Sequence, residues 1–206
     1  MEKQLLKPEY DKITAYFLLI GKVFEGKTRK KSVDISNLKD GDSVLIIAPP
    51  TEFYLNSLLR LNPHGNNHLL YFSKRLRQES EKLLKKETVY SIELCNGHKF
   101  PYDNSCFDHI FAFCYLDFLE KEGLEPAVKE IHRVLKKRGN LMTTYLTNPK
   151  NFLEKLSISL FHKLSIVKDI NSIDIIPYLH NSNFKVVTKF HFSQKFVPVD
   201  LVYAEK

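Results

Sequence analysis

The sequence is poor in glycine, with seven among 206 residues, which is few for a protein that needs tight turns around a nucleotide. Its three cysteines are odd in number and widely spread, so they do not form a disulfide framework. The longest apolar stretch near the N-terminus covers residues 15–21, far short of the roughly 20 residues that span a bilayer. No small-residue cleavage site follows it. The sequence therefore predicts neither a transmembrane segment nor a signal peptide, and we expect a cytoplasmic protein.

Several catalytic motifs are also missing from the sequence. It contains no Gly-x-Ser-x-Gly elbow, no phosphate-binding P-loop and no His-Glu-x-x-His pattern, so hydrolytic chemistry of these types has no support. Cys95-x-x-His98 and Cys106-x-x-His109 have the spacing of paired zinc ligands. However, His109 is expected to begin a buried strand and to point differently from Cys106. We therefore predict no metal site.

The composition is that of one soluble globular domain covering residues 1–206, with 43% hydrophobic and 27% charged residues. The formal net charge is +7, which would attract nucleic acid, anionic lipid or acidic proteins. The basic residues gather in three groups, each expected at a loop or helix end: Lys27, Arg29, Lys30 and Lys31; Lys74, Arg75 and Arg77; Lys136, Lys137 and Arg138. No aromatic-interleaved binding motif accompanies them, so we expect a solvated surface rather than a nucleic-acid-binding one.

Short apolar runs alternate with helical patterns along the chain. The runs predict strands at 43–47, 68–72, 88–94, 108–114 and 140–145, and the helices between them are expected at 52–61, 74–86 and 123–136. This alternation predicts a doubly wound α/β fold, with a mostly parallel sheet and helices on both faces. Residues 9–24 are expected to form a helix outside the sheet, within an N-terminal helical segment 1–36.

The last part of the chain follows a different pattern. Residues 184–192 and 197–205 are two strand-like runs joined by a short segment with no helix between them. They are expected to form an antiparallel hairpin that completes a seven-stranded sheet.

Two segments of the chain resemble those of a known family. Residues 100–119 (FPYDNSCFDHIFAFCYLDFL) are similar to its Leu-Pro-Phe, polar loop, Phe-Asp and fourth strand, and residues 130–139 (EIHRVLKKRG) to its Glu-x-x-Arg-Val-Leu-Lys-Pro-Gly-Gly. On these segments the chain resembles the class I S-adenosylmethionine (SAM)-dependent methyltransferases. It resembles especially the small-molecule, type 11 group that is related to ubiquinone and menaquinone biosynthesis enzymes. The resemblance implies a Rossmann-like fold with SAM at the carboxyl ends of the strands.

The resemblance also implies which positions would contact SAM. A turn after the first strand would hold the methionine part of SAM, and the end of the second strand would bind the ribose. The loop after the third strand would contact the adenine, and the residue after the fourth strand would also line the site. In this sequence those positions are Ala48, Pro49 and Pro50; Tyr71 and Phe72; Asn96 and Gly97; and Cys114.

This cofactor site departs from the family pattern. The three glycine positions of the first turn hold Ala48, Pro50 and Glu52, and the acidic position of the first strand holds Ile46. Proline fixes φ and donates no backbone hydrogen bond, so Pro49 and Pro50 remove two donors from the turn. The ribose-binding acid is replaced by Tyr71 or Phe72.

Some residues near the expected site allow two interpretations. Tyr115 and Asp117 follow the fourth strand, where acceptor substrates approach, but they also suit the start of a helix; Asp108, which opens that strand, is expected to be structural. Residues 148–168 are amphipathic, with Phe152, Leu156, Leu160 and Leu164 every four residues. They predict either a helix packed on the core, or a lid insertion, a partner groove or a membrane-surface contact.

Three hypotheses about function follow. The first is a SAM-dependent methyltransferase with a divergent cofactor site and a small-molecule or lipid-like acceptor. The second is a catalytically inactive homologue, a pseudoenzyme, that serves as a binding or regulatory partner of another protein. The third is a basic protein that associates with nucleic acid.

Overall fold

The computed structural model describes residues 26–47, 52–84, 90–95, 99–163, 173–194 and 196–206. The predicted helix 9–24 lies outside these residues. So do Ala48, Pro49 and Pro50 of the first turn, Asn96 and Gly97 of the third loop, and His98.

The strands of the described residues form one seven-stranded sheet in the order β3-β2-β1-β4-β5-β7-β6. Their bounds are β1 Ser43–Ile47, β2 Asn66–Tyr71, β3 Ser91–Leu94, β4 Phe107–Phe113, β5 Leu135–Leu146, β6 Lys185–Gln194 and β7 Val197–Glu205. Neighbouring strands from β3 to β5 run parallel, whereas β7 pairs antiparallel with both β5 and β6. The predicted α/β fold with a C-terminal antiparallel hairpin is therefore confirmed.

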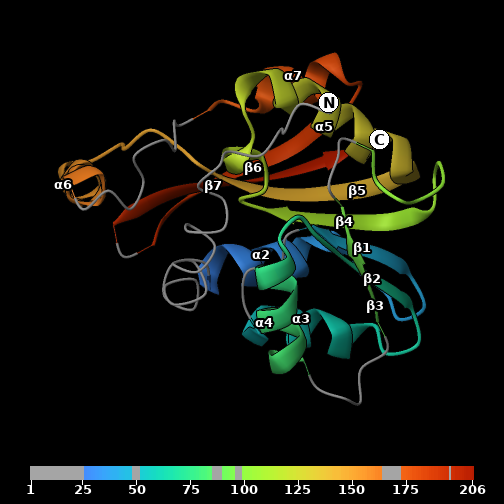
Figure 1. Ribbon diagram of the computed structural model, residues 1–206. Coiled ribbons are helices and arrows are strands. Elements are labelled where there is room, and N and C mark those ends of the chain that lie inside the picture. Colours follow the sequence, from blue (N-terminus) through green and yellow to red (C-terminus); the bar gives the residue numbers. More distant parts are fainter. Residues whose placement is uncertain (1–25, 48–51, 85–89, 96–98, 164–172, 195) are drawn as a thin grey trace, which may run out of the picture.

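Helices cover both faces of this sheet (Figure 1). Their bounds are α2 Gly26–Ser36, α3 Glu52–Leu61, α4 Lys74–Leu83, the 3-10 helix η1 Leu116–Phe118, α5 Lys121–Val134, α6 Phe152–Lys163 and α7 Ile176–Asn181. Helices α2, α3 and α4 lie on one face, and α5 and α7 lie on the other; α6 lies apart from both layers, to one side of β6 and β7. This arrangement gives three layers.

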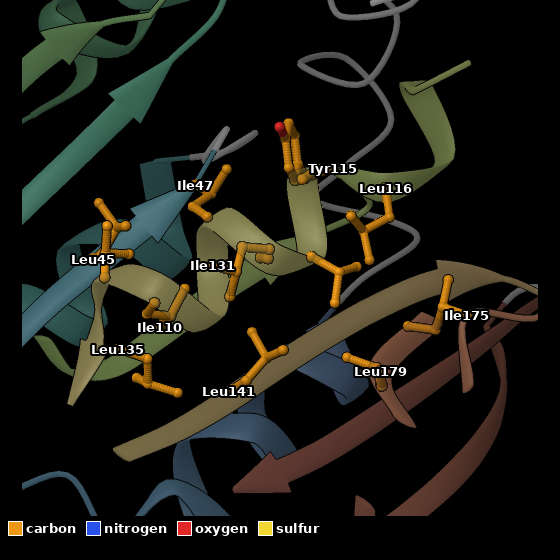
Figure 2. Close-up of a cluster of buried hydrophobic side chains, with 14 of the residues drawn as sticks. Leu45, Ile47, Ile110, Tyr115, Leu116, Ile131, Leu135, Leu141, Ile175 and Leu179 are labelled. Atoms are coloured by element: carbon orange, nitrogen blue, oxygen red, sulfur yellow. The ribbon is translucent and has the colours of Figure 1, made fainter. Parts of the chain in front are cut away.

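The core divides into two clusters because alternate strand residues point to opposite faces. Leu45 and Ile47 of β1 join the cluster under α5 and α7, which includes Ile131 and Leu179 (Figure 2). Val44 and Ile46, also of β1, join the cluster under α3 and α4. All four β1 residues are at most 1% exposed, as expected for a parallel strand covered on both sides.

The boundary between α5 and β5 differs from the prediction. The helix was expected to continue to residue 136 and the strand to begin at residue 140. Instead, Leu135 already has extended backbone angles (φ −74°, ψ 136°), so α5 ends at Val134 and β5 begins one residue later. Leu135 pairs with Phe107, and a register shift separates this pair from the regular ladder that begins at Asn140.

The basic group on residues 27–31 was predicted to be solvated, and for Arg29 this prediction is wrong. Arg29 is 3% exposed, on the face of α2 that packs against the sheet. Its guanidinium lies over the Phe113 ring, 5.7 Å from the ring centroid. Lys27 and Lys30, its neighbours in the sequence, are exposed as predicted. The burial of Arg29 therefore follows from packing against residues distant in the sequence and not from its local sequence.

The two segments that carry the family resemblance contact each other. Glu130 of α5 accepts a hydrogen bond from the Phe100 backbone N–H over 2.6 Å. Arg133 of the same helix binds Glu130 and donates to the backbone carbonyls of Phe100 and Tyr102. The Glu-x-x-Arg pattern therefore holds the loop that precedes β4, which is a structural role.

Candidate functional site

The candidate site lies at the edge of the sheet where β1, β2, β3 and β4 end, which we call the carboxyl edge. The chain crosses from β1 outward to β2 and β3 and then returns to β4 on the other side of β1. Such a switch point is where open α/β sheets bind their ligands, because the connecting loops diverge there. Of the positions that the resemblance assigns to SAM, the structure describes Tyr71, Phe72 and Cys114.

An aromatic cluster occupies the carboxyl edge next to β2. Phe72, the residue after β2, stacks on Tyr115, which follows β4; the ring centroids are 4.9 Å apart and the planes differ by 14°. Phe100 packs against both rings, with its centroid 6.2 Å from Phe72 and 6.5 Å from Tyr115. Tyr115 stands at the end of β4 among the core residues (Figure 2), and its side chain is 3% exposed. Three residues from separate loops therefore meet at one place.

Tyr71 and Cys114 are placed differently from Phe72. Tyr71 is fully buried in the cluster under α3 and α4, and burial raises the pKa of its hydroxyl. Cys114 has a positive φ of 51°, and its backbone N–H donates to both the carbonyl and the hydroxyl of Thr144. Burial raises the pKa of the Cys114 thiol to about 12, so this thiol is protonated and unreactive at neutral pH.

No carboxylate stands at the end of β2, where Tyr71 is the last strand residue and Phe72 follows it. In the family that the sequence resembles, a carboxylate at this position accepts hydrogen bonds from the two ribose hydroxyls. Phe72 has no acceptor, and its ring is engaged with Tyr115. Of the three aromatic residues only Phe72 is partly exposed, and its ring suits contact with an apolar or aromatic group.

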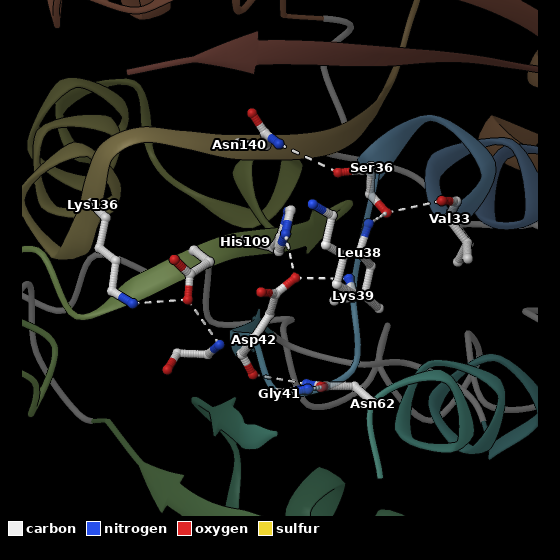
Figure 3. Close-up of polar contacts among 12 residues, drawn as sticks. Val33, Ser36, Leu38, Lys39, Gly41, Asp42, Asn62, His109, Lys136 and Asn140 are labelled. Atoms are coloured by element: carbon white, nitrogen blue, oxygen red, sulfur yellow. Dashed lines mark hydrogen bonds and ion pairs between the residues drawn. The ribbon is translucent and has the colours of Figure 1, made fainter. Parts of the chain in front are cut away.

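The acidic residues near β4 have structural partners. Asp117 is 1% exposed and accepts a hydrogen bond from the Leu146 N–H at the end of β5. Asp108 binds the Ser43 N–H over 2.9 Å and Lys136 over 2.8 Å (Figure 3). Burial raises the pKa of Asp108, but these two hydrogen bonds outweigh it and lower the pKa below its usual value. Asp108 therefore joins β1 to β4 as an ionised carboxylate, as expected of a structural residue.

Of the four residues with zinc-like spacing, the structure describes Cys95, Cys106 and His109, and these three do not form one group. His109 Nε2 lies 3.1 Å from Asp42 on the loop before β1 (Figure 3), and burial lowers the pKa of this imidazole. Cys106 Sγ contacts the Asp103 carbonyl, and Cys95 Sγ contacts the Lys99 carbonyl. These three side chains each have a different local partner.

A cavity that the sequence did not predict shares Phe100 with the aromatic cluster. It has a volume of about 590 Å³ and is reached between the starts of β1, β2 and β4 and the loop before β4; its lining is Ser43, Asn66, His68, Lys99, Phe100, Pro101, Tyr102, Asp103, Cys106 and Phe107. His68 faces Ser91 (2.7 Å) and meets the edges of the Tyr102 and Phe107 rings. Within the described part of the chain, the buried Tyr102 hydroxyl has no hydrogen-bond partner. The sequence signal that could have found this cavity is His68 itself, a polar residue inside an apolar strand.

Comparisons with known proteins agree with the fold described above. Residues 51–143 match the family model described as a methyltransferase domain. This part of the chain is therefore similar to a methyltransferase domain. No curated protein sequence matches the chain.

Solved structures share the fold over nearly the whole chain. One is a protein assigned as a methyltransferase in complex with the Trm112 methyltransferase activator of Haloferax volcanii (TM-score 0.76, 13% identity, covering 97% of this chain and 96% of that one). A SAM-dependent methyltransferase from Aquifex aeolicus gives a TM-score of 0.68 at 18% identity, covering 95% and 97%. The [4+2]-cyclase SpnF gives 0.70 at 12% identity, covering 100% and 99%. At these identities the likeness shows the fold alone, and the fold does not determine the reaction.

One residue of each basic group is buried or paired in this fold. Arg29 is buried, Arg77 pairs with Glu81 on α4, and Lys136 pairs with Asp108. These partners neutralise part of each basic group. None of the helices in the described residues is long and apolar enough to cross a membrane.

Proposed function

We propose that this methyltransferase-like protein is a pseudoenzyme: it does not use SAM as a methyl donor and acts as a binding or regulatory partner of another protein. The observation that supports the proposal is the stack of Phe72 on Tyr115 at the end of β2, the position that the sequence resemblance assigns to the ribose. An aromatic pair there supports contact with an apolar group and leaves the ribose hydroxyls without an acceptor.

The expected loss of SAM affinity is large. A hydrogen bond to a charged group contributes roughly 1.5–3 kcal/mol, and each 1.4 kcal/mol changes affinity about tenfold. Replacement of a bidentate carboxylate by Phe72 therefore costs at least about tenfold. The sequence Ala48-Pro49-Pro50 removes glycines and two backbone donors from the first turn as well, which adds to the loss.

The proposal of a protein partner has separate support. The Haloferax volcanii structure is a complex with a methyltransferase activator, so a protein of this fold has been captured with a protein partner. We propose a protein partner for this chain too, and a cytoplasmic location.

Isothermal titration of the purified protein with SAM and its demethylated product, up to millimolar ligand, tests the proposal. We expect no saturable heat and no thermal stabilisation. The variant Phe72→Asp restores an acceptor at the end of β2, and Phe72→Asn is the matched control of similar size without the charge. Binding of SAM by the unchanged protein at tens of micromolar or tighter would overturn the proposal, whereas a gain restricted to Phe72→Asp would support it.

A second candidate is an active SAM-dependent methyltransferase for a small-molecule or lipid-like acceptor. The family match over residues 51–143 and the complete strand order favour it. Methyl transfer needs mainly the positioning of donor and acceptor, so the reaction does not require a catalytic triad. Tight SAM binding in the same titration would favour this candidate, and a search for the acceptor would follow.

Nucleic-acid association is the third candidate, supported by the net charge of +7. The partners of Arg29, Arg77 and Lys136 reduce the free basic surface. Binding to mixed-sequence DNA or RNA that weakens steeply with salt would support this candidate.

A further inference from the structure

Helix α6 presents its apolar face to solvent. Four of its large apolar residues are exposed: Phe152 by 75%, Leu153 by 49%, Leu156 by 58% and Leu160 by 54%. At 100° per residue these positions fall within an arc of about 100°, so they form one face. The prediction that this helix packs its apolar stripe on the core is therefore wrong for the described residues, because the stripe points outward.

The polar side of α6 is the side that is anchored to the protein. Glu154 is fully buried; it accepts a hydrogen bond from the Lys150 N–H over 2.6 Å and faces His191 of β6, with Nε2 and Oε1 3.4 Å apart. His191 Nδ1 in turn lies 2.7 Å from the buried Asp200. Rotation of α6 would break the contact with His191 and leave that imidazole without its Glu154 partner, so the contact favours the observed orientation of α6.

The turn between β6 and β7 adds a further exposed aromatic residue beside α6. The Phe196 side chain is 50% exposed, and its φ of 69° lies in the left-handed region that bulky residues rarely adopt. Its carbonyl accepts a hydrogen bond from the Ser157 hydroxyl of α6. Strain of this kind is retained where a particular side-chain position is useful. The exposed residues Phe152, Leu153, Leu156, Leu160 and Phe196 are called the apolar ridge below.

Within residues 148–163, the exposed charges near the apolar ridge have one sign. Lys150 and Lys155 are exposed, while Glu154, which is the one carboxylate of residues 148–163, is buried. The whole chain carries a net charge of +7. A second copy of the chain would bring two positive faces together, whereas an anionic surface would complement both the lysines and the apolar side chains.

We propose that the apolar ridge docks on the surface of an anionic lipid bilayer. The apolar side chains enter the headgroup boundary, as amphipathic interfacial helices do, and Lys150 and Lys155 contact the lipid phosphates. The ridge is short, so docking is reversible and depends on both the apolar residues and the lysines. This inference is independent of SAM binding and of the proposed pseudoenzyme role.

Co-sedimentation of the full chain with vesicles tests docking, with no SAM present. Vesicles of phosphatidylcholine with about one third phosphatidylglycerol should bind the protein, and pure phosphatidylcholine should bind it weakly. The double variant Phe152→Ser/Leu156→Ser should lower the vesicle partition coefficient by about tenfold or more. Leu61→Ser is the matched control, because Leu61 of α3 is also 50% exposed but lies away from the ridge.

A second pair of variants tests how much the lysines contribute to vesicle binding. Lys155→Glu should weaken binding to the anionic vesicles, whereas Lys121→Glu, an equal charge change at an exposed position of α5, should weaken it less. Equal binding by the double variant and the unchanged protein would overturn the proposal. So would a dimer in light scattering that the double variant abolishes, together with no binding to anionic vesicles, because the ridge would then be an interface between copies.

Discussion

Arg133 donates a hydrogen bond to the backbone carbonyl of Tyr102 over 2.9 Å and so joins α5 to the loop before β4. The same guanidinium binds both carboxylate oxygens of Glu130 and the side chain of Asn104. The hydrogen bonds and charge of Glu130 raise the pKa of Arg133 further, although partial burial opposes this. One side chain therefore holds together the two segments by which the sequence resembles its family.

Arg133→Leu should lower the free energy of unfolding by about 2 kcal/mol. The change removes hydrogen bonds to charged and backbone groups and leaves Glu130, whose side chain is 11% exposed, without its cation. Urea unfolding followed by circular dichroism measures the effect. The matched control is Arg77→Leu, because Arg77 forms an exposed pair with Glu81 and should change stability by about 0.5 kcal/mol at most. An equal loss in both variants would contradict the structural role of Arg133.

The strands were predictable from the sequence because buried parallel strands are short and almost entirely apolar. β1 was predicted to the residue, since Ser43 and Ile47 bound an uninterrupted run. The predicted start of β5 was too late, because the first residues of this strand include the charged residues 136–138, which the helical periodicity assigns to the end of the preceding helix.

The orientation of α6 and the burial of Arg29 could not be predicted from the sequence, for a different reason. A four-residue period shows that Phe152, Leu156 and Leu160 share a face, but it does not show which way the face points. That direction depends on Glu154 meeting His191, 37 residues away. In the same way, the stack of Phe72 on Tyr115 joins the ends of two strands that the sequence predicts separately.

The Phe72 and Tyr115 rings should show a measurable coupling energy. Alanine at either position should lower stability, and a double-mutant cycle should give a coupling of about 0.5–1.5 kcal/mol, the range for stacked aromatic pairs. Chemical unfolding of the four proteins measures it. Phe190 and Phe192 on β6, whose rings are 6.4 Å apart and tilted by 43°, provide a comparison cycle with a smaller expected coupling. Additive losses for Phe72 and Tyr115 would mean that the stack contributes nothing beyond burial.

Acid should weaken the hairpin through Asp200. Burial raises the pKa of this carboxyl, but Lys189 at 2.9 Å and His191 at 2.7 Å outweigh burial and lower the pKa below its ordinary value of 3.8. Because the folded pKa is the lower one, the ionised carboxylate stabilises the fold above about pH 4. This contribution is lost as the pH falls through the folded pKa.

Asp200→Asn isolates that contribution. At pH 7 the variant should be about 3 kcal/mol less stable, because Lys189 and His191 lose a buried partner. The difference between the variant and the unchanged protein should narrow below pH 3 in urea unfolding. Asp34→Asn, at an exposed position of α2, should show no such convergence. A difference that stays constant from pH 7 to the lowest pH measured would exclude Asp200 as the titrating group.

Gly65 should not accept even the smallest side chain. A Cβ at this position would lie 2.1 Å from the Asn62 side-chain oxygen, so Gly65→Ala must displace Asn62. Asn62 is fully buried; it accepts a hydrogen bond from the Gly41 N–H and donates one to the Asp42 carbonyl (Figure 3). It also donates a hydrogen bond to the Asn67 side-chain oxygen.

Displacing Asn62 leaves buried polar groups without partners, so Gly65→Ala should cost about 2–3 kcal/mol of unfolding free energy. Gly26→Ala is the matched control, since a Cβ there meets nothing within 4 Å and alanine favours the helix it begins. Denaturant midpoints of the two variants measure the difference. Asn62→Ala tests the cause, because adding Gly65→Ala to it should cost much less than the same change in the unchanged protein. If the second substitution costs as much in both backgrounds, Gly65 is required for a reason other than the position of Asn62.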